Sequence, residues 1–284
     1  MNSSTADSTP SFRTRLRVRF ADFVSRQRET TGSLLNAFRE RRWRAFAFGG
    51  TPRGVWDEGP SYQPRDLDIV FEDSHFEDFA SVFRGCIQRR TRFDGLHLKI
   101  GGLAVDAWSL SATWAFRQGL VSEASFENLP RTTFFNADAI VVSLLPKSRG
   151  REFYESGFRR AWEDRILDIN LEANPFPALC VVRAFRLASH FHFHFSPRLL
   201  NYVAQTMNGF TDGELADLQA AHYGHIFFPP ARLAELRRTV TKHWQKSPIL
   251  PLRLFPGQLR FWPPSANFET PKLSSTGARK SRHA

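Results

Sequence analysis

The sequence predicts an α/β (α+β) domain with a mixed β-sheet, followed by a smaller all-α lobe. Two observations predict this fold class. Up to about residue 155, short apolar runs bounded by glycine alternate with segments in which apolar residues recur at helical spacing. Beyond that point, segments that start near Pro or Asp and keep helical spacing follow one another. We therefore expect a sheet covered by helices in the first part and a helical lobe in the second.

The strand-like runs lie on both sides of two glycine pairs. One apolar run ends in Gly49-Gly50, and a later run begins at Asp66. Two further runs joined by Gly101-Gly102 predict a β-hairpin. The expected strands are residues 45–48, the run from Asp66, residues 96–100 and 103–108, and residues 139–145 as a strand or short buried helix. The expected helices are residues 30–42, 75–90, 175–195, 197–208, 212–222 and 229–244.

The chain divides into four parts on composition. We expect a basic N-terminal arm at residues 1–20, an α/β domain at 21–154, a helical lobe at 155–247, and a Pro/Phe-rich segment with a basic mobile tail at 248–284. Within the arm, Arg13, Arg15, Arg17 and Arg19 alternate with apolar or small residues. This period of two predicts an extended segment with four guanidinium groups on one face, either a phosphate-binding arm or a solvated edge strand.

Charge and composition limit the class of partner. The 284 residues carry a formal net charge of +11 with a pI near 10.4, so a polyanionic partner is expected. Nucleic acid is the first candidate and an anionic membrane surface the second, while solubility alone is the remaining interpretation. No run approaches the ~18 uninterrupted apolar residues of a membrane span. Cys86 and Cys180 lie in apolar stripes, which favours buried, reduced thiols and a cytoplasmic location.

The glycine pair after the first strand has the properties of a phosphate cradle. Gly49 and Gly50 lack a Cβ, so the backbone there can turn sharply and approach a ligand closely. Backbone N–H groups in such a turn bind phosphate oxygens well. An ordinary hairpin turn is the alternative interpretation.

Three aspartates form a candidate site for a hard cation. Asp66 and Asp68 lie two residues apart in a strand, so both carboxylates point to one face. Asp106 lies in the hairpin and would join them if the hairpin pairs beside their strand. Mg²⁺, or Mn²⁺ in its place, is usually held by one or two carboxylates plus nucleotide phosphates. Solvated edge residues are the alternative.

These motifs together resemble a known family. Gly49-Gly50-x-x-Arg53 followed by Asp66-x-Asp68-Ile-Val resembles the head of the DNA polymerase beta superfamily of nucleotidyltransferases, and within it the bacterial CCA-adding enzymes and poly(A) polymerases. The resemblance spans roughly residues 40 to 200 with the order of motifs kept.

The resemblance continues in two downstream segments. Arg131-Thr-Thr-Phe-Phe-Asn136-Ala137 is similar to the family's Arg-Arg-Asp-Phe-Thr-Ile-Asn-Ala segment. Arg183-Ala-Phe-Arg186-Leu-Ala is similar to its Arg-Ala-Leu-Arg-Phe-Ala helix.

The chain also departs from the family pattern. Gly54 stands where the family usually has an acid, and Thr132 replaces the Asp of Arg-Arg-Asp. The Glu-Asp-x-x-Arg that pairs with the incoming base is missing, and the region reads Glu172-Ala-Asn174-Pro-Phe176-Pro. One amide and one aromatic face would give only loose selection among bases, with purines favoured.

The resemblance implies transfer of a nucleoside monophosphate from an NTP to an acceptor hydroxyl. It implies a two-metal mechanism, with Asp66, Asp68 and Asp106 as catalytic residues and as the ligands of two Mg²⁺ ions. The nucleotide-binding residues that it implies are Gly49, Gly50, Arg53, Arg131, Asn136, Arg183 and Arg186. The charge favours an RNA 3′ end as acceptor, while a small molecule, a protein hydroxyl, or a non-catalytic RNA-binding protein that keeps the fold stay open.

Overall fold

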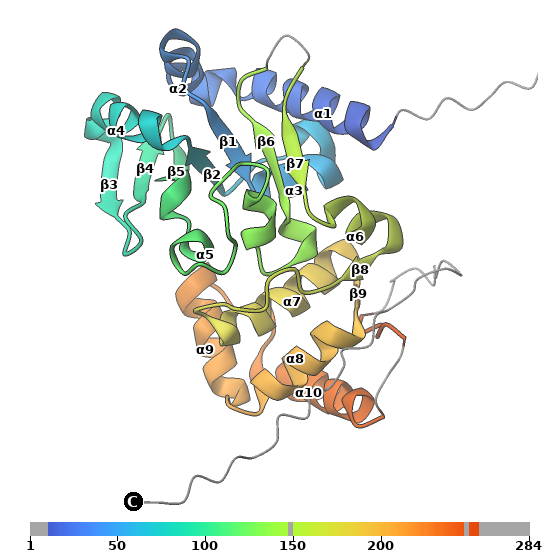
Figure 1. Cartoon of the computed structure of the whole chain (residues 1–284). Coiled ribbons are helices and arrows are strands. Elements are labelled where there is room, and N and C mark those ends of the chain that lie inside the picture. Colours follow the sequence, from blue (N-terminus) through green and yellow to red (C-terminus); the bar gives the residue numbers. More distant parts are fainter. Residues whose placement is uncertain (1–10, 147–149, 247–249, 256–284) are drawn as a thin grey trace, which may run out of the picture.

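The computed structural model describes residues 11–146, 150–246 and 250–255. The expected mobile tail and the first ten residues lie outside these ranges. The α/β part contains the sheet and its covering helices, and the helical lobe lies at one end of it (Figure 1). No helix in the described ranges is long and apolar enough to cross a membrane.

A seven-stranded sheet forms the centre of the α/β part, in the order β3-β4-β5-β2-β1-β6-β7. β2 and β5 run parallel and the other neighbours antiparallel, which confirms the predicted mixed sheet. The strands are β1 (Ala45–Phe48), β2 (Asp66–Phe71), β3 (Ile87–Arg90), β4 (Leu96–Ile100), β5 (Leu103–Ser109), β6 (Ile140–Ser143) and β7 (Phe153–Glu155).

Four helices cover one face of this sheet, and their apolar side chains make the main core with it. They are α1 (Phe12–Arg26), α2 (Arg28–Arg41), α3 (Gly50–Glu58) and α4 (Asp73–Val82). Within the core, the ring of Phe71 lies 5.4 Å from that of Phe38 and 4.3 Å from that of Phe79, centroid to centroid. Alternation along β2 sends Leu67, Ile69 and Phe71 into this core and the intervening residues to the opposite face.

The opposite face carries a smaller apolar cluster. Its buried members are Phe46, Val70, Leu110, Phe126, Leu129 and Val141. They lie under the segment between β5 and β6, which contains η3 (Leu110–Ala112), α5 (Trp114–Arg117), η4 (Leu129–Thr132) and η5 (Asn136–Asp138). Because Asp66 and Asp68 alternate with core residues of β2, they lie on this second face.

The N-terminal segment is a helix, so the predicted extended arm was wrong. Leu16, Phe20, Phe23 and Val24 are buried at helical spacing, and the Ser11 hydroxyl accepts the Thr14 N–H at the helix start. Burial of this apolar stripe outweighed the period-two pattern of arginines, which are helix formers in their own right.

The arginines of α1 contact aromatic rings of the α/β domain. Arg13 and Arg17 lie over the Phe153 ring, while Arg15 lies 4.4 Å from the Trp56 ring centroid, with Arg19 near the same ring. The helix therefore packs as part of the domain, and the boundary predicted at residue 20 falls inside it.

A second difference concerns residues 75–90. The predicted helix ends with α4 at Val82, and after η2 (Arg84–Cys86) the chain enters β3, whose Arg89 and Arg90 are exposed. Pairing of Ile87 with Leu98 on β4 fixes this edge strand. Long-range pairing of this kind is not visible in local periodicity.

The helical lobe comprises α6 (Phe158–Asp164), α7 (Pro177–Phe191), α8 (Pro197–Met207), α9 (Asp212–Tyr223) and α10 (Pro230–Trp244), with β8 (Ile166–Leu167) and β9 (His194–Phe195) as a two-stranded sheet. Four helices of the lobe lie where they were predicted, but the one predicted at residues 175–195 ends at Phe191, and α6, β8 and β9 were not predicted. The main core continues from the sheet into this lobe without interruption, so the division near residue 154 stays an interpretation. Cys86 and Cys180 are free thiols; Cys180 is buried as expected, whereas Cys86, in η2, is only half-buried.

Residues 56–61, which follow the buried part of α3, are helical, and the chain then folds back against α3. Trp56 to Glu58 end α3, and η1 (Gly59–Ser61) brings the Tyr62 ring onto Gly54. A Cβ on Gly54 would lie 2.3 Å from a carbon of that ring, closer than real contacts allow. The ring therefore occupies the space that a side chain at residue 54 would need.

Two helical glycines give a matched test of this packing. Gly54→Ala should destabilise the protein by about 1–3 kcal/mol, because the methyl group overlaps the Tyr62 ring. Gly32→Ala in α2 is the control: its Cβ meets nothing within 4 Å, so the gain in helix propensity should stabilise by up to ~1 kcal/mol. Urea unfolding measures both. Equal effects of the two substitutions would contradict the packing of Tyr62 on α3.

Candidate functional site

The structure brings the three predicted aspartates together on two neighbouring strands. β2 pairs with β5 in parallel register, with Asp68 opposite Asp106 and Asp66 opposite Ala104. The three carboxyl side chains are partly buried, and each alternates with a buried apolar residue. Asp66, Asp68 and Asp106 thus form a carboxylate row on the sheet face that α1–α4 leave uncovered.

Each outer carboxylate of the row has a cationic or polar partner. Arg65 donates from Nη2 to Asp66 Oδ2 at 2.6 Å. On the other side, His97 Nδ1 lies 2.7 Å from Asp106 Oδ1, because β4 places His97 opposite Asp106. Asp68 lies between them: burial, then the negative charges of Asp66 and Asp106, raises its pKa to about 7.

The kind of donor in this row suits a hard divalent cation. Three carboxylates lie on neighbouring positions of one sheet face, and oxygen ligands of this kind suit Mg²⁺ and Mn²⁺. The row does not bring all its carboxylate oxygens within 4.8 Å of one another, a spacing that among the described residues is met by the separate group Asp57, Glu58 and His190. The raised pKa of Asp68 means that a negative charge there is unfavourable without a cation nearby. Asp66, Asp68 and Asp106 would hold the ion, which would supply charge neutralisation at a phosphate.

The glycine pair lies at the start of α3. Gly49 has φ +57° and ψ −103°, a conformation that glycine alone adopts easily, and its N–H donates to Ile140 O at 3.2 Å. Gly50 begins the helix, so the first-turn N–H groups of α3 point along the helix axis, out of its N-terminal end. The buried Thr51 hydroxyl donates to the carbonyl of Asp66 at 3.4 Å, which ties this helix end to the start of β2.

Arg53 and Arg183 share one buried carboxylate, that of Asp138. Arg53 donates from Nη1 to Asp138 Oδ1, and Arg183 from Nη2 to Oδ2 at 3.0 Å. Asp138 is 4% exposed. Burial, then the charge of Arg183, lowers the pKa of Arg53 to about 10. Sequence reasoning missed Asp138, which fixes Arg53 of α3 and Arg183 of α7 beside the carboxylate row.

The other predicted nucleotide-binding residues differ in exposure and in their hydrogen bonds. Arg186 is exposed on α7, with its guanidinium 4.5 Å from the Phe227 ring centroid. Arg131 is exposed on η4. The Asn136 amide donates to Ile166 O and accepts from the Asp168 N–H, so it links η5 to β8. A ligand contact of Asn136 stays a prediction from the resemblance alone.

The region that lacks the family's base-reading motif lies at the start of α7. Asn174 Oδ1 accepts the N–H of Phe176 at 2.7 Å, and the Phe176 ring is 44% exposed. Arg92, from the turn between β3 and β4, stacks 4.5 Å from the same ring centroid. The predicted loose selection among bases stays a prediction.

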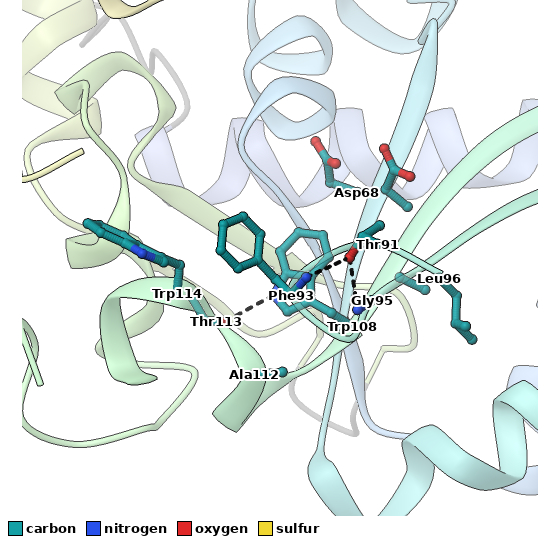
Figure 2. Close-up of a pocket in the computed structure, with 11 residues that line it drawn as sticks. Asp68, Thr91, Phe93, Gly95, Leu96, Trp108, Ala112, Thr113 and Trp114 are labelled. Atoms are coloured by element: carbon teal, nitrogen blue, oxygen red, sulfur yellow. Dashed lines mark hydrogen bonds between the residues drawn. The ribbon is translucent and has the colours of Figure 1, made fainter. Parts of the chain in front are cut away.

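A pocket of about 310 Å³ opens beside the carboxylate row (Figure 2). Asp68 and Asp106 line it together with aromatic side chains from β5, α5 and the β3–β4 turn. The full lining is Asp68, Thr91, Phe93, Gly95, Leu96, Asp106, Ala107, Trp108, Ala112, Thr113 and Trp114. Sequence reasoning did not single out these aromatic residues.

A separate group of possible cation ligands lies on the surface. Asp57, Glu58 and His190 are exposed, and their ligand atoms lie within 4.8 Å of one another. Asp57 and Glu58 lie at the end of α3, and His190 lies at the end of α7. Because exposed carboxylates are well solvated, this group carries less electrostatic strain than the carboxylate row.

Removing the charge at Asp68 should stabilise the protein when divalent cations are absent. The folded-state pKa of about 7 lies above the ordinary 3.8, so the ionised group opposes folding at pH 8 and ceases to do so as the pH falls towards 4. Asp68→Asn should therefore raise the unfolding free energy by about 1–3 kcal/mol at pH 8 in EDTA, and by less at pH 5.

Urea unfolding at the two pH values measures this difference. Asp217→Asn, an exposed carboxylate on α9, is the control and should change little. A loss of stability in Asp68→Asn at pH 8 would contradict the repulsion assigned to the row.

Comparison with known proteins places the fold. No protein-family model matches the chain, and no curated protein matches it. Solved structures do match. A tRNA-processing enzyme in an apo form aligns with a TM-score of 0.53 at 21% identity, over 75% of this chain and 57% of that one.

Two structures of CCA-adding enzymes align as well. An apo form gives a TM-score of 0.52 at 18% identity, over 75% of this chain and 50% of that one. A complex with CTP gives 0.51 at 16% identity, over 81% and 54%. The chain thus spans little more than half the length of these proteins, and at such identities the likeness concerns the fold. The chain has the fold of the CCA-adding and tRNA-processing enzymes, as the sequence motifs indicated.

Proposed function

We propose that this protein is a metal-dependent nucleotidyltransferase that moves a nucleoside monophosphate from an NTP to an acceptor hydroxyl, with an RNA 3′ end as the favoured acceptor. The observation that carries the proposal is the carboxylate row on β2 and β5, together with the Gly49-Gly50 turn and the Arg53–Asp138–Arg183 cluster, whose arginine charges act on Asp68. The fold shared with tRNA-processing and CCA-adding enzymes supports it.

The anionic triphosphate would lie on the cationic side of this site. The first-turn N–H groups of α3 and the guanidinium groups of Arg53 and Arg183 favour negative charge. Because both arginines are held by Asp138, little reorganisation is needed when the phosphates bind. Arg186 and the exposed Arg131 would widen this cradle.

The reaction forms one bond and breaks another. The acceptor hydroxyl oxygen attacks the α-phosphorus, the bond from that phosphorus to its bridging oxygen breaks, and pyrophosphate leaves with the electron pair. A divalent cation held by the carboxylate row would neutralise charge on the phosphates. Asp106, which His97 orients at 2.7 Å, would take the proton of the hydroxyl.

Two other acceptor classes use the same chemistry, namely a small molecule and a protein hydroxyl. The net charge of +11 favours RNA over both, because neutralising several backbone phosphates releases counterions. A non-catalytic protein that kept the fold is the rival of a different class. The partly buried, mutually repelling carboxylates disfavour that rival, since a protein without a cation to bind gains nothing from them.

Removal of the metal ligands tests the activity. Asp66→Asn and Asp68→Asn should each lower the rate of transfer from α-labelled NTP to RNA by about a thousandfold or more. Without the bound cation, the transition state loses several kcal/mol of charge stabilisation, and each ~1.4 kcal/mol lowers the rate tenfold. Asp217→Asn on α9 is the matched control and should keep the wild-type rate.

The assay uses purified protein, saturating Mg²⁺, each labelled NTP and total RNA, with small-molecule and protein fractions analysed in parallel. Wild-type rates in the two variants would overturn the mechanism. Label that enters only protein or small molecules would instead move the acceptor from RNA to one of those classes.

A further inference from the structure

The pocket beside the carboxylate row has a distinctly aromatic wall. Phe93, Trp108 and Trp114 supply three half-buried rings, and Asp68 lies to one side of them (Figure 2). Asp106 also lines the pocket. Its volume of about 310 Å³ is at the small end of the ~300–1,000 Å³ usual for ligand pockets. One planar ring system with its sugar suits this size. We refer to these three rings and the space between them as the aromatic pocket.

Two of these rings are fixed in place by their surroundings. Trp108 donates from Nε1 to the Thr113 hydroxyl at 3.0 Å and packs edge-on against Phe48, 5.9 Å between centroids. Phe93 lies in a tight turn in which the Thr91 hydroxyl accepts the N–H groups of Phe93 and Gly95. Rings that do not need to be ordered on binding retain more of the stacking energy.

Gly95 lets the turn that carries Phe93 pack closely against β5. A Cβ there would lie 3.0 Å from the Thr91 hydroxyl and 3.1 Å from the carbonyl of Ala107. A side chain at this position would therefore push the turn away from β5. The turn that carries Phe93 and the strand that carries Trp108 can approach closely only with glycine at this position.

Positive charge continues from the pocket along the edge of the sheet. Arg89 and Arg90 are exposed on β3, the edge strand, and Arg92 is exposed next to Phe93. The carboxylate of Asp94 in the same turn is paired with Arg117 at 2.9 Å, which leaves this rim cationic. An aromatic site bordered by exposed arginines is the arrangement that single-stranded nucleic acids bind.

We propose that the aromatic pocket receives the terminal nucleobase of a polynucleotide acceptor, whose preceding phosphates contact Arg92 and Arg89, the β3 arginine that pairs with His97 and so lies on the face of the carboxylate row. This rests on the proposed function and names its acceptor as the 3′ end of a single-stranded RNA. Stacking of the last base would place its ribose hydroxyl at the Asp68 and Asp106 edge of the pocket, where the proton is removed.

The same features disfavour the other acceptor classes. A protein serine or threonine offers no planar group for three aromatic rings, and a polycationic sugar would be repelled by the arginine rim. A nucleobase satisfies both features, because every base has a π-face and brings phosphates with it.

The test compares two short RNAs of one length, labelled at the 5′ end, by fluorescence anisotropy in Mg²⁺-free buffer. One RNA ends in an ordinary nucleotide and the other in an abasic ribose. The wild-type protein should bind the intact end about tenfold more tightly, which corresponds to one stacked base. Trp114→Leu should bring the two affinities within about twofold while leaving the abasic RNA bound as before.

Two further variants make the test specific. Phe93→Leu repeats it at a second ring, in case one substitution disturbs folding. Trp244→Leu, a half-buried tryptophan of α10 outside the pocket, is the matched control and should keep the tenfold preference. Equal binding of both RNAs by wild-type protein, or equal weakening of both by Trp114→Leu, would overturn the proposal.

The arginine rim has its own readout. Arg89→Gln should weaken both RNAs alike and reduce the salt slope by about 0.7, the value for one phosphate contact on a single strand. Arg90→Gln, on the opposite face of β3, is the control and should leave the slope unchanged. An unchanged slope in Arg89→Gln would remove this arginine from the RNA path.

The outcomes also separate this proposal from the proposed function. Aspartate-dependent transfer to another acceptor, without preference for the intact RNA end, would end this proposal and leave the enzyme standing. Preference for the intact RNA end, without transfer of nucleotide to any acceptor, would support the pocket as a base-binding site and contradict the proposed enzyme activity.

Discussion

Electrostatic repulsion among three carboxylates is the constraint on which the rest of the site depends. Parallel pairing of β2 with β5 places Asp68 opposite Asp106. Buried apolar neighbours such as Ile69 fix the register of both strands, because a shift by one residue would turn these aspartates into the core. The sheet thus holds negative charges together at a free-energy cost. Arg65 and His97 balance the outer two, and the middle one keeps a raised pKa that a divalent cation would relieve.

A second charged centre joins the two parts of the chain. Asp138 is nearly inaccessible and receives Arg53 from α3 and Arg183 from α7. Without the Asp138 carboxylate, the Arg53 and Arg183 guanidinium groups would lose their shared buried partner, which is strongly unfavourable. The helical lobe is therefore fixed against the sheet at the point where a triphosphate would lie, so the fold itself sets the distance between the anion-binding groups and the carboxylate row.

Much of this site follows from local pattern. Strand alternation predicted that Asp66 and Asp68 lie on one face. The two-residue Gly101-Gly102 turn pairs Ile100 with Leu103, and counting back along both strands puts His97 opposite Asp106. This partner of Asp106 could therefore have been found from the sequence. Other features depend on long-range packing. The α1 helix forms because its apolar stripe is buried against the domain, although its arginines alternate as in a strand. The role of Asp138 and the gathering of the aromatic rings depend on segments that meet only in the folded chain.

Cation binding separates the account from its alternatives most directly. Electron paramagnetic resonance titration with Mn²⁺ and a non-hydrolysable NTP analogue should show a bound ion whose affinity rises with the analogue, because metal and phosphates share ligands. Asp66→Asn with Asp68→Asn should abolish this site, while Asp57→Asn with Glu58→Gln, at the exposed group near His190, should leave it unchanged. Loss of the ion in the second double variant and its retention in the first would contradict the assignment of the carboxylate row as the metal centre.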